Sequence, residues 1–223
     1  VSQKLITSVT GSNDDLGVGL HCHDMVDYRE NIYIRKIILK NPGDREGKFR
    51  LFFHHDFHIL ESPTGDTAYY DPDEQAVIHY KGNRCFLVSG MRNNHQGIDQ
   101  YAVGIKEFRG LEGTWKDAED GWLEGGPIAQ GSIDSCLSLW ISIPGKGEQV
   151  LFYWMTVGKN YADVSRLNRL IGEHGPEYFI SRTGNYWRAW VNKEEFNLTK
   201  LPTHIVELYK KSLLILRTNI DSA

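Results

Sequence analysis

The chain has 223 residues, 40% of them hydrophobic and 24% charged, so it can build a globular core and does not have the composition of a disordered protein. Its 25 Lys and Arg and 29 Asp and Glu give a net charge of −4, and the basic residues are scattered, which argues against a nucleic-acid-binding protein. The three cysteines lie far apart without a CxxC pair, as is typical of reduced thiols in a cytosolic protein.

Residues 1 to about 158 are predicted to form β structure. Runs rich in β-branched and aromatic residues, bounded by Gly, Pro and Asn, are typical of strands. These runs cover residues 31–40, 48–59, 76–80, 85–90, 100–108, 136–143 and 149–158. Turn sequences at 41–47, 82–83 and 144–148 predict that the flanking strands pair as hairpins. Consecutive hairpins with no helix between them indicate an antiparallel sandwich, and the fold class is therefore mainly β.

The hydrophobic period changes after Gly158, and three helices are predicted. The first has Asp163 as its candidate N-cap and ends at Gly175. The second begins at Pro176, because proline is a favoured first residue of a helix. The third begins at Pro202 and carries an apolar stripe at helical spacing, formed by Ile205, Leu208, Tyr209, Leu213 and Leu216.

The ends of the chain carry no sign of export or of a membrane anchor. Residues 1–15 lack the apolar core of a signal peptide. The most apolar stretch near the C-terminus, SLLIL at 212–216, is far too short to span a membrane. The sequence therefore predicts a soluble protein of the cytoplasm, with no membrane partner and no nucleic-acid partner.

The stretch RLFFHHDFHI, residues 50–59, combines three histidines with one aspartate. If it is a strand, His55 lies on the apolar face and is predicted to be a core histidine held by a hydrogen bond. His54, Asp56 and His58 then share the other face and have the chemistry of zinc ligands. However, neighbours on one face of a straight strand are roughly 6.5–7 Å apart. We therefore predict no metal ion here, and a polar interface instead.

Two further segments combine aromatic and acidic residues. Tyr69 and Tyr70 precede an Asp-Pro turn, and we interpret them as a strand end, with contact to a sugar as the alternative. The segment 115–135 is predicted to be a long structured loop, a kind of element that often carries function. Its candidate residues for carbohydrate or for a domain interface are Trp115, Asp117, Asp120 and Trp122. Acidic pairs of the kind that glycosidases use are present in this loop, but no complete active site is predicted there.

A third cluster, Asp27, Arg29 and Glu30, is interpreted as a set of ion pairs at the start of a strand.

Taken together, these segments resemble the prokaryotic glucoamylase-like enzymes of glycoside hydrolase family 15. The motifs that carry the resemblance are at 26–36, 50–59, 65–72, 77–84, 115–135 and 208–221. That family includes glucoamylases, glucodextranases and some archaeal trehalases. The resemblance covers nearly the whole chain from Asp27 onward.

This resemblance implies a domain organisation. Residues 1–158 would form an N-terminal β-supersandwich that lacks its first strands, and residues 159–200 would form linker helices. Residues 201–223 would begin the first helix of an (α/α)6 catalytic barrel. The family hydrolyses α-glucosidic bonds with inversion of configuration, using a glutamate acid and a glutamate base of that barrel. The resemblance therefore implies no catalytic residue and no cofactor within these 223 residues.

The expected function is therefore that of the non-catalytic sandwich and linker of an inverting α-glucosidase. Its expected partners are the catalytic barrel, an α-glucan or α-glucoside bound through the parent enzyme, and a second copy of the chain. Self-association is expected because an incomplete sheet has an unpaired edge and the last helix has an unpartnered apolar stripe.

Two alternatives belong to other classes of protein. One is a free-standing carbohydrate-binding sandwich that uses Trp115, Trp122 or the pair Tyr69 and Tyr70. The other is a mutarotase-like sandwich enzyme, in which His54 or His58 would act with a glutamate.

Overall fold

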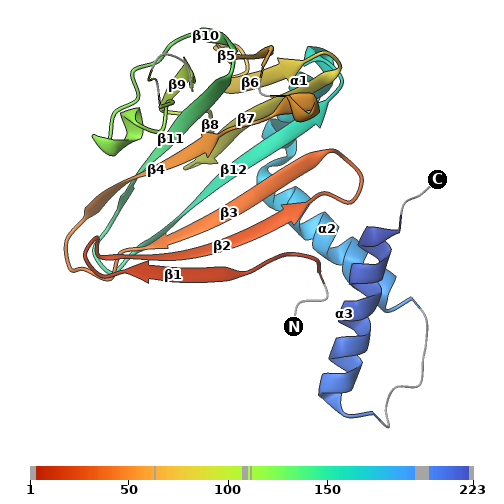
Figure 1. Cartoon of the computed structure of the whole chain (residues 1–223). Helices are drawn as coiled ribbons and strands as arrows, with labels where there is room; N and C mark the ends of the chain where they lie inside the picture. Colours follow the sequence, from red (N-terminus) through yellow and green to blue (C-terminus); the bar gives the residue numbers. More distant parts are fainter. Residues whose placement is uncertain (1–3, 63, 107–109, 111, 194–200, 221–223) are drawn as a thin grey trace.

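The computed structural model describes residues 4–62, 64–106, 110, 112–193 and 201–220. The chain forms two antiparallel sheets followed by three helices, as Figure 1 shows. This arrangement confirms the predicted fold class, a mainly β sandwich with helices at its C-terminal end. No helix within the described residues is long and apolar enough to cross a membrane.

The larger sheet has nine strands and the smaller sheet has three. The larger sheet runs in the order β1 (Val9–Asn13), β2 (Val18–Val26), β3 (Ile32–Lys40), β12 (Glu148–Gly158), β7 (Arg84–Arg92), β6 (Ala76–Lys81), β5 (Asp66–Asp71) and β10 (Ile128–Gly131), with β8 (His95–Gln96) paired to β7. The smaller sheet runs in the order β4 (Gly47–His55), β11 (Ile133–Ile143) and β9 (Gln100–Ile105). Sequence patterns did not predict β1 and β2. β1 is exposed throughout and shows no apolar period, and β2 buries only Cys22 and Met25.

Only one of the three predicted hairpins is present. β6 and β7 pair across a tight turn in which Gly82 has a positive φ of 54°, which confirms that hairpin. The hairpins predicted at 41–47 and 144–148 are wrong, because each of these turns carries the chain from one sheet to the other. β3 pairs with β2 and β12, whereas β4 and β9 pair with β11. A Pro-Gly turn reverses the chain in either case, so its sequence does not reveal which sheet the next strand joins.

Apolar side chains fill two layers, one on each face of the larger sheet. Between the sheets, Ile37 and Leu39 of β3 pack with Leu139 of β11. On the opposite face, Ile32 and Trp154 belong to a second core, completed by residues of the helices such as Leu167, Ile171 and Phe179. β3 is therefore buried on both faces, and its apolar positions do not alternate simply along the strand.

The helices begin and end close to the predicted positions. α1 (Tyr161–His174) stops at Gly175, which has a φ of 79°, as predicted. Its N-cap is Asn160, whose side chain accepts a hydrogen bond from the Asp163 N–H at 3.0 Å, so the prediction of Asp163 as the cap is wrong. The Asp163 carboxylate instead accepts a hydrogen bond of 2.9 Å from the N–H of Lys159, the residue before the cap.

The second and third helices differ in how much of their surface is covered. α2 (Pro176–Val191) begins at the predicted proline and buries Phe179, Thr183 and Val191. α3 (Thr203–Asn219) packs beside α2 and buries only Leu214 (Figure 1). Leu208 and Leu216 of the predicted stripe are each 60% exposed.

Two buried carboxylates fasten the first two helices to the larger sheet. Glu74, in the turn between β5 and β6, accepts hydrogen bonds from Ser165, Asn168 and Arg169 of α1. Burial by itself raises the pKa of Glu74, but these three side chains outweigh that effect and hold the pKa below its ordinary value. The carboxylate therefore stays charged, and α1 supplies most of what stabilises the charge.

Asp27, just after β2, plays the same part for α2. Its carboxylate accepts from the Arg182 guanidinium, at 2.6 and 2.9 Å, and from the Thr183 hydroxyl at 2.7 Å. It also accepts from the N–H groups of Arg29 and Glu30 in its own turn. Burial by itself raises the pKa of Asp27, and these bonds reverse the effect and lower it. Asp27 thus forms a structural ion pair with Arg182 of α2, and Glu30 forms one with Arg166 of α1. Ion pairs are present as predicted, but they join the cluster to the helices and do not join its members to one another.

A polar network lies in the core between the two sheets. His55 Nε2 is 2.7 Å from the Tyr153 hydroxyl, and His79 Nε2 is 2.7 Å from the hydroxyl of Ser135. Burial, reinforced for His55 by the neighbouring His79, lowers the pKa of His55 to about 3, and burial lowers that of His79 to about 4. His55 is therefore a neutral core histidine with a hydrogen-bond partner, which confirms the prediction for it.

These two imidazoles predict an acid-sensitive fold. Unfolded histidines bind protons below about pH 6.5, whereas the folded ones resist protonation until the pH reaches their lowered pKa values. The free energy of unfolding should therefore fall as the pH drops from about 6.5 towards 4. In His79→Leu this fall should be shallower by up to about 1.4 kcal/mol per pH unit, as measured by urea denaturation at several pH values. The surface variant His95→Leu is the control, and an unchanged slope in His79→Leu would contradict the neutral core imidazole.

Candidate functional site

The segment 112–127 forms a long loop over the outer face of the smaller sheet. Leu123 anchors it by packing against Ala102 and Cys136, the neighbouring outward residues of β9 and β11. A backbone hydrogen bond of 2.9 Å from the Val103 N–H to the Gly125 carbonyl joins the loop to β9. The loop contains one short 3-10 turn, Asp117–Glu119, and its two sides border different clefts.

A buried aspartate of the sheet holds the start of this loop. Asp134 Oδ2 accepts from the Thr114 N–H and lies 2.8 Å from both this nitrogen and His54 Nε2. Gly113, with a φ of 111°, brings the backbone so close that a Cβ there would lie 2.4 Å from the same oxygen. His54, the first polar residue of the histidine run, therefore contacts the same carboxylate that holds the start of the loop.

His54, Asp56 and His58 do not form one row, because β4 ends at His55. Asp56 instead forms an ion pair with Lys106, and His58 Nε2 lies 3.3 Å from the same ammonium group. In the described part of the chain no three His, Cys, Asp or Glu side chains are grouped to hold a metal ion. His54 and His58 are both engaged in these contacts, so the mutarotase-like alternative gains no support from them.

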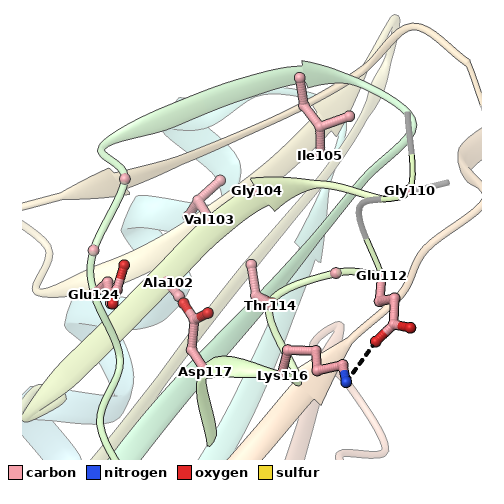
Figure 2. A pocket seen from close by; sticks show the side chains of 13 residues that line it. Ala102, Val103, Gly104, Ile105, Gly110, Glu112, Thr114, Lys116, Asp117 and Glu124 are labelled. Atoms are coloured by element: carbon pink, nitrogen blue, oxygen red, sulfur yellow. Dashed lines mark ion pairs between the residues drawn. The ribbon is translucent and has the colours of Figure 1, made fainter. Parts of the chain in front are cut away.

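The first cleft beside the loop, which we call the acidic cleft, has a volume of about 540 Å³. Figure 2 shows Asp117 and Glu124 towards one end of it, and Glu112 paired with Lys116 towards the other. No aromatic side chain is among the described residues that line this cleft. Asp117, a predicted candidate, therefore lies among carboxylates but without a surface on which a sugar ring can stack.

The second cleft measures about 680 Å³ and is lined by residues of the loop, of β4 and of β11, among them Asp120, Arg50 and Trp140. Trp122 is not among its described lining residues but lies beside it, next to Arg50 and Trp140, and we call it the Trp122 cleft for this reason. The Arg50 guanidinium lies 3.9 Å from the ring centre of Trp140 and 5.4 Å from that of Trp122. Asp120 lines the cleft, and its Oδ1 accepts from the Trp122 N–H at 2.9 Å. The structure thus brings together two predicted candidates, Asp120 and Trp122.

Arg50 and Trp140 complete this cleft, and sequence reasoning did not find them. They are directly opposite each other in the β4–β11 register. The false hairpin between β3 and β4 concealed that pairing. Alternation alone places both side chains on the outward face of their strands, which is the one signal available from the sequence.

The remaining candidates lie apart from one another. Tyr70 faces the smaller sheet and stacks on Tyr101 with ring centres 4.1 Å apart. Tyr69 faces the other way, into a cleft with Tyr80 and Tyr161, and burial raises its pKa to about 12. The two tyrosines therefore do not form one surface. Trp115 is 42% exposed, and its indole N–H donates to the Glu112 carbonyl at 2.9 Å.

Comparison with known proteins points to the glycoside hydrolases. No protein-family model matches the chain. An uncharacterised glycosyl hydrolase of Methanocaldococcus jannaschii is 27% identical over 178 residues, which are 78% of this chain and 28% of that protein. A bacterial glucoamylase in complex with acarbose matches with a TM-score of 0.67 at 12% identity, over 86% of this chain and 27% of that one. The chain thus has the fold found in part of a glucoamylase and weak homology to a glycosyl hydrolase, and it spans little more than a quarter of either protein.

The Asp134 anchor can be tested by proteolysis. Asp134→Ala removes an acceptor shared by Thr114 and His54, and a hydrogen bond to a charged group stabilises by about 1.5–3 kcal/mol. The fraction of molecules in which the loop is locally open should therefore rise. As a result, trypsin should cleave after the exposed Lys116 about tenfold faster or more. Asp44→Ala, in a distant exposed turn, is the control. If the Asp134→Ala variant were cleaved after Lys116 at the same rate as the parent chain, the anchoring role of Asp134 would be contradicted.

Proposed function

We propose that this chain is a non-catalytic sandwich-and-linker module of a glycoside hydrolase that acts on α-glucosidic bonds, and that it supports a separate catalytic domain. The observation that carries the proposal is the extent of the glucoamylase match, which covers 86% of this chain and therefore includes helices as well as sandwich. The 27% identity to a glycosyl hydrolase over 178 residues supports the same class of protein.

The carboxylates of the chain also support a non-catalytic role. An inverting glycosidase needs one carboxyl as general acid and another as base, with the sugar between them. Asp27, Glu74 and Asp134 are buried, and each accepts hydrogen bonds that fix helices or a loop. They are structural groups. Asp117 and Glu124 are more accessible, but their cleft offers no stacking surface.

In this proposal the domain boundaries follow the elements. Residues 1–158 form the sandwich, whose last strand ends at Gly158, and residues 159–200 contain the linker helices α1 and α2. Residues 201–223 begin the first helix of an (α/α)6 barrel, and α3 is that helix.

The exposed face of α3 supports a domain partner. At about 100° per residue, Ile205, Leu208, Ile215 and Leu216 fall within one arc of roughly 100°. All four are exposed, and the buried Leu214 lies on the opposite side. A catalytic domain that packs on this stripe would cover it.

The proposal predicts that the purified 223-residue chain releases no glucose from maltose, isomaltose or trehalose, because the proton donor and the base are both outside it. Glucose release above that of a mock preparation, lost on Asp117→Asn or Glu124→Gln, would contradict the proposal. The sequence downstream of Ala223 in the parent gene is an independent check. Several hundred residues of helical pattern with two glutamates support the proposal, and an early stop codon would refute it.

The exposed stripe of α3 also predicts self-association of the isolated chain. Burial stabilises each such side chain by roughly 1.5–3 kcal/mol, so two copies should pair through their α3 helices at tens of micromolar. The double variant Leu208→Lys with Leu216→Lys should be monomeric by light scattering while its helical circular dichroism is kept. Lys211→Ala, an exposed residue outside the stripe, is the control. A monomeric parent chain with α3 ordered would rule this association out.

A further inference from the structure

We propose that the Trp122 cleft is a non-catalytic binding site for a neutral oligosaccharide of α-linked glucose. The identity of the sugar rests on the proposed function, whereas the location of the site rests on the geometry of the cleft. Its volume of about 680 Å³ is within the range of small-molecule sites and has room for more than one sugar ring.

The aromatic surface of the site is held in place before any ligand arrives. The Arg50 guanidinium lies beside both the Trp122 and the Trp140 ring, and the centres of these two rings are themselves 5.9 Å apart. The Asp120 side chain fixes the backbone of Trp122, and the adjacent Leu123 is buried in the sheet. Trp122 nevertheless remains 54% exposed. A large ring fixed from one side and open to solvent on the other is a surface on which the apolar face of a sugar can stack, at little cost in side-chain entropy.

The polar groups around this ring can both donate hydrogen bonds to hydroxyl groups and accept hydrogen bonds from them. Every sugar hydroxyl both donates and accepts a hydrogen bond. Within the described residues no carboxylate or carbonyl bonds the Arg50 guanidinium, so its N–H groups are available as donors. Asp120 has a second carboxylate oxygen available as an acceptor. Arg92 and Asp99, at the far side, neutralise each other in an ion pair.

The other two clefts lack this combination. The acidic cleft has carboxylates but no aromatic lining. The cleft of Tyr69, Tyr80 and Tyr161 has rings, but no carboxylate is among its described lining residues. The Trp122 cleft differs from both in having tryptophan rings in or beside its lining together with charged groups of both signs.

Nuclear magnetic resonance of the indole N–H groups tests the site directly. The chain has six tryptophans, and the Trp122 and Trp115 signals are assigned from the variants Trp122→Ala and Trp115→Ala. On titration with maltotriose, the Trp122 signal should move and saturate in the millimolar range. The Trp115 signal should not move, although Trp115 lies on the same loop and is also exposed. Trp122→Ala should weaken binding by about tenfold or more, and Trp115→Ala should leave it unchanged.

Each alternative outcome has a defined meaning. No saturable shift of Trp122, or an equal response of Trp115, would overturn the site. A response to cellotriose but not to maltotriose would refute the proposal that the ligand is an α-linked oligosaccharide. The glucose-release assay and the gene sequence downstream of Ala223 test the proposed function independently of these titrations. A hydrolase parent with no shift of Trp122 would therefore refute only this inference. If the Trp122 signal shifts but the parent gene encodes no hydrolase, the binding site would be supported and the proposed function refuted. The chain would then be a free-standing sugar-binding sandwich.

Discussion

The attachment of the helices to the sandwich depends on two buried carboxylates whose partners lie on those helices. If α1 left the larger sheet, Glu74 would lose three side-chain donors, and if α2 left, Asp27 would lose Arg182 and Thr183. A buried charge without its partners is far more costly than an ordinary lost contact. The apolar core around Trp154 and Phe179 supplies buried contact area between the helices and the larger sheet. Glu74 and Asp27 fix the positions of α1 and α2 on that sheet.

This attachment also determines which surface of the sandwich is left for recognition. The helices cover the outer face of the larger sheet around β12 and β7, and the smaller sheet covers its inner face. Among the described residues, the loop 112–127 lies over the outer face of the smaller sheet. That loop is narrow and is pinned at Thr114 and Leu123, so clefts remain on both of its sides. The surface that holds Trp122 and Arg50 is thus a consequence of how the rest of the sandwich is covered.

Periodicity predicted the features that depend on neighbours along the chain. The helix boundaries at Gly175 and Pro176, the β6–β7 hairpin and the core position of His55 are of this kind. What the sequence did not show depends on pairing between distant segments. Arg50 and Trp140 are opposite each other only because β4 joins β11 rather than β3. The opposite directions of Tyr69 and Tyr70, in contrast, follow from alternation along a strand, so their side chains serve different surfaces.

α3 differs from the other two helices, and the difference bears on function. α1 and α2 each have a buried carboxylate partner and several buried side chains, whereas α3 has Leu214 and a hydrogen bond of 2.6 Å from Lys210 to Asn192. A helix of 17 residues is only marginally stable in water by itself, and most helical stability in proteins comes from packing of an apolar face. The apolar face of α3 is the one that the sandwich does not cover. A further domain on that face would stabilise α3 and would be positioned by it, since α3 contacts α2 and α2 is fixed to the sandwich through Asp27.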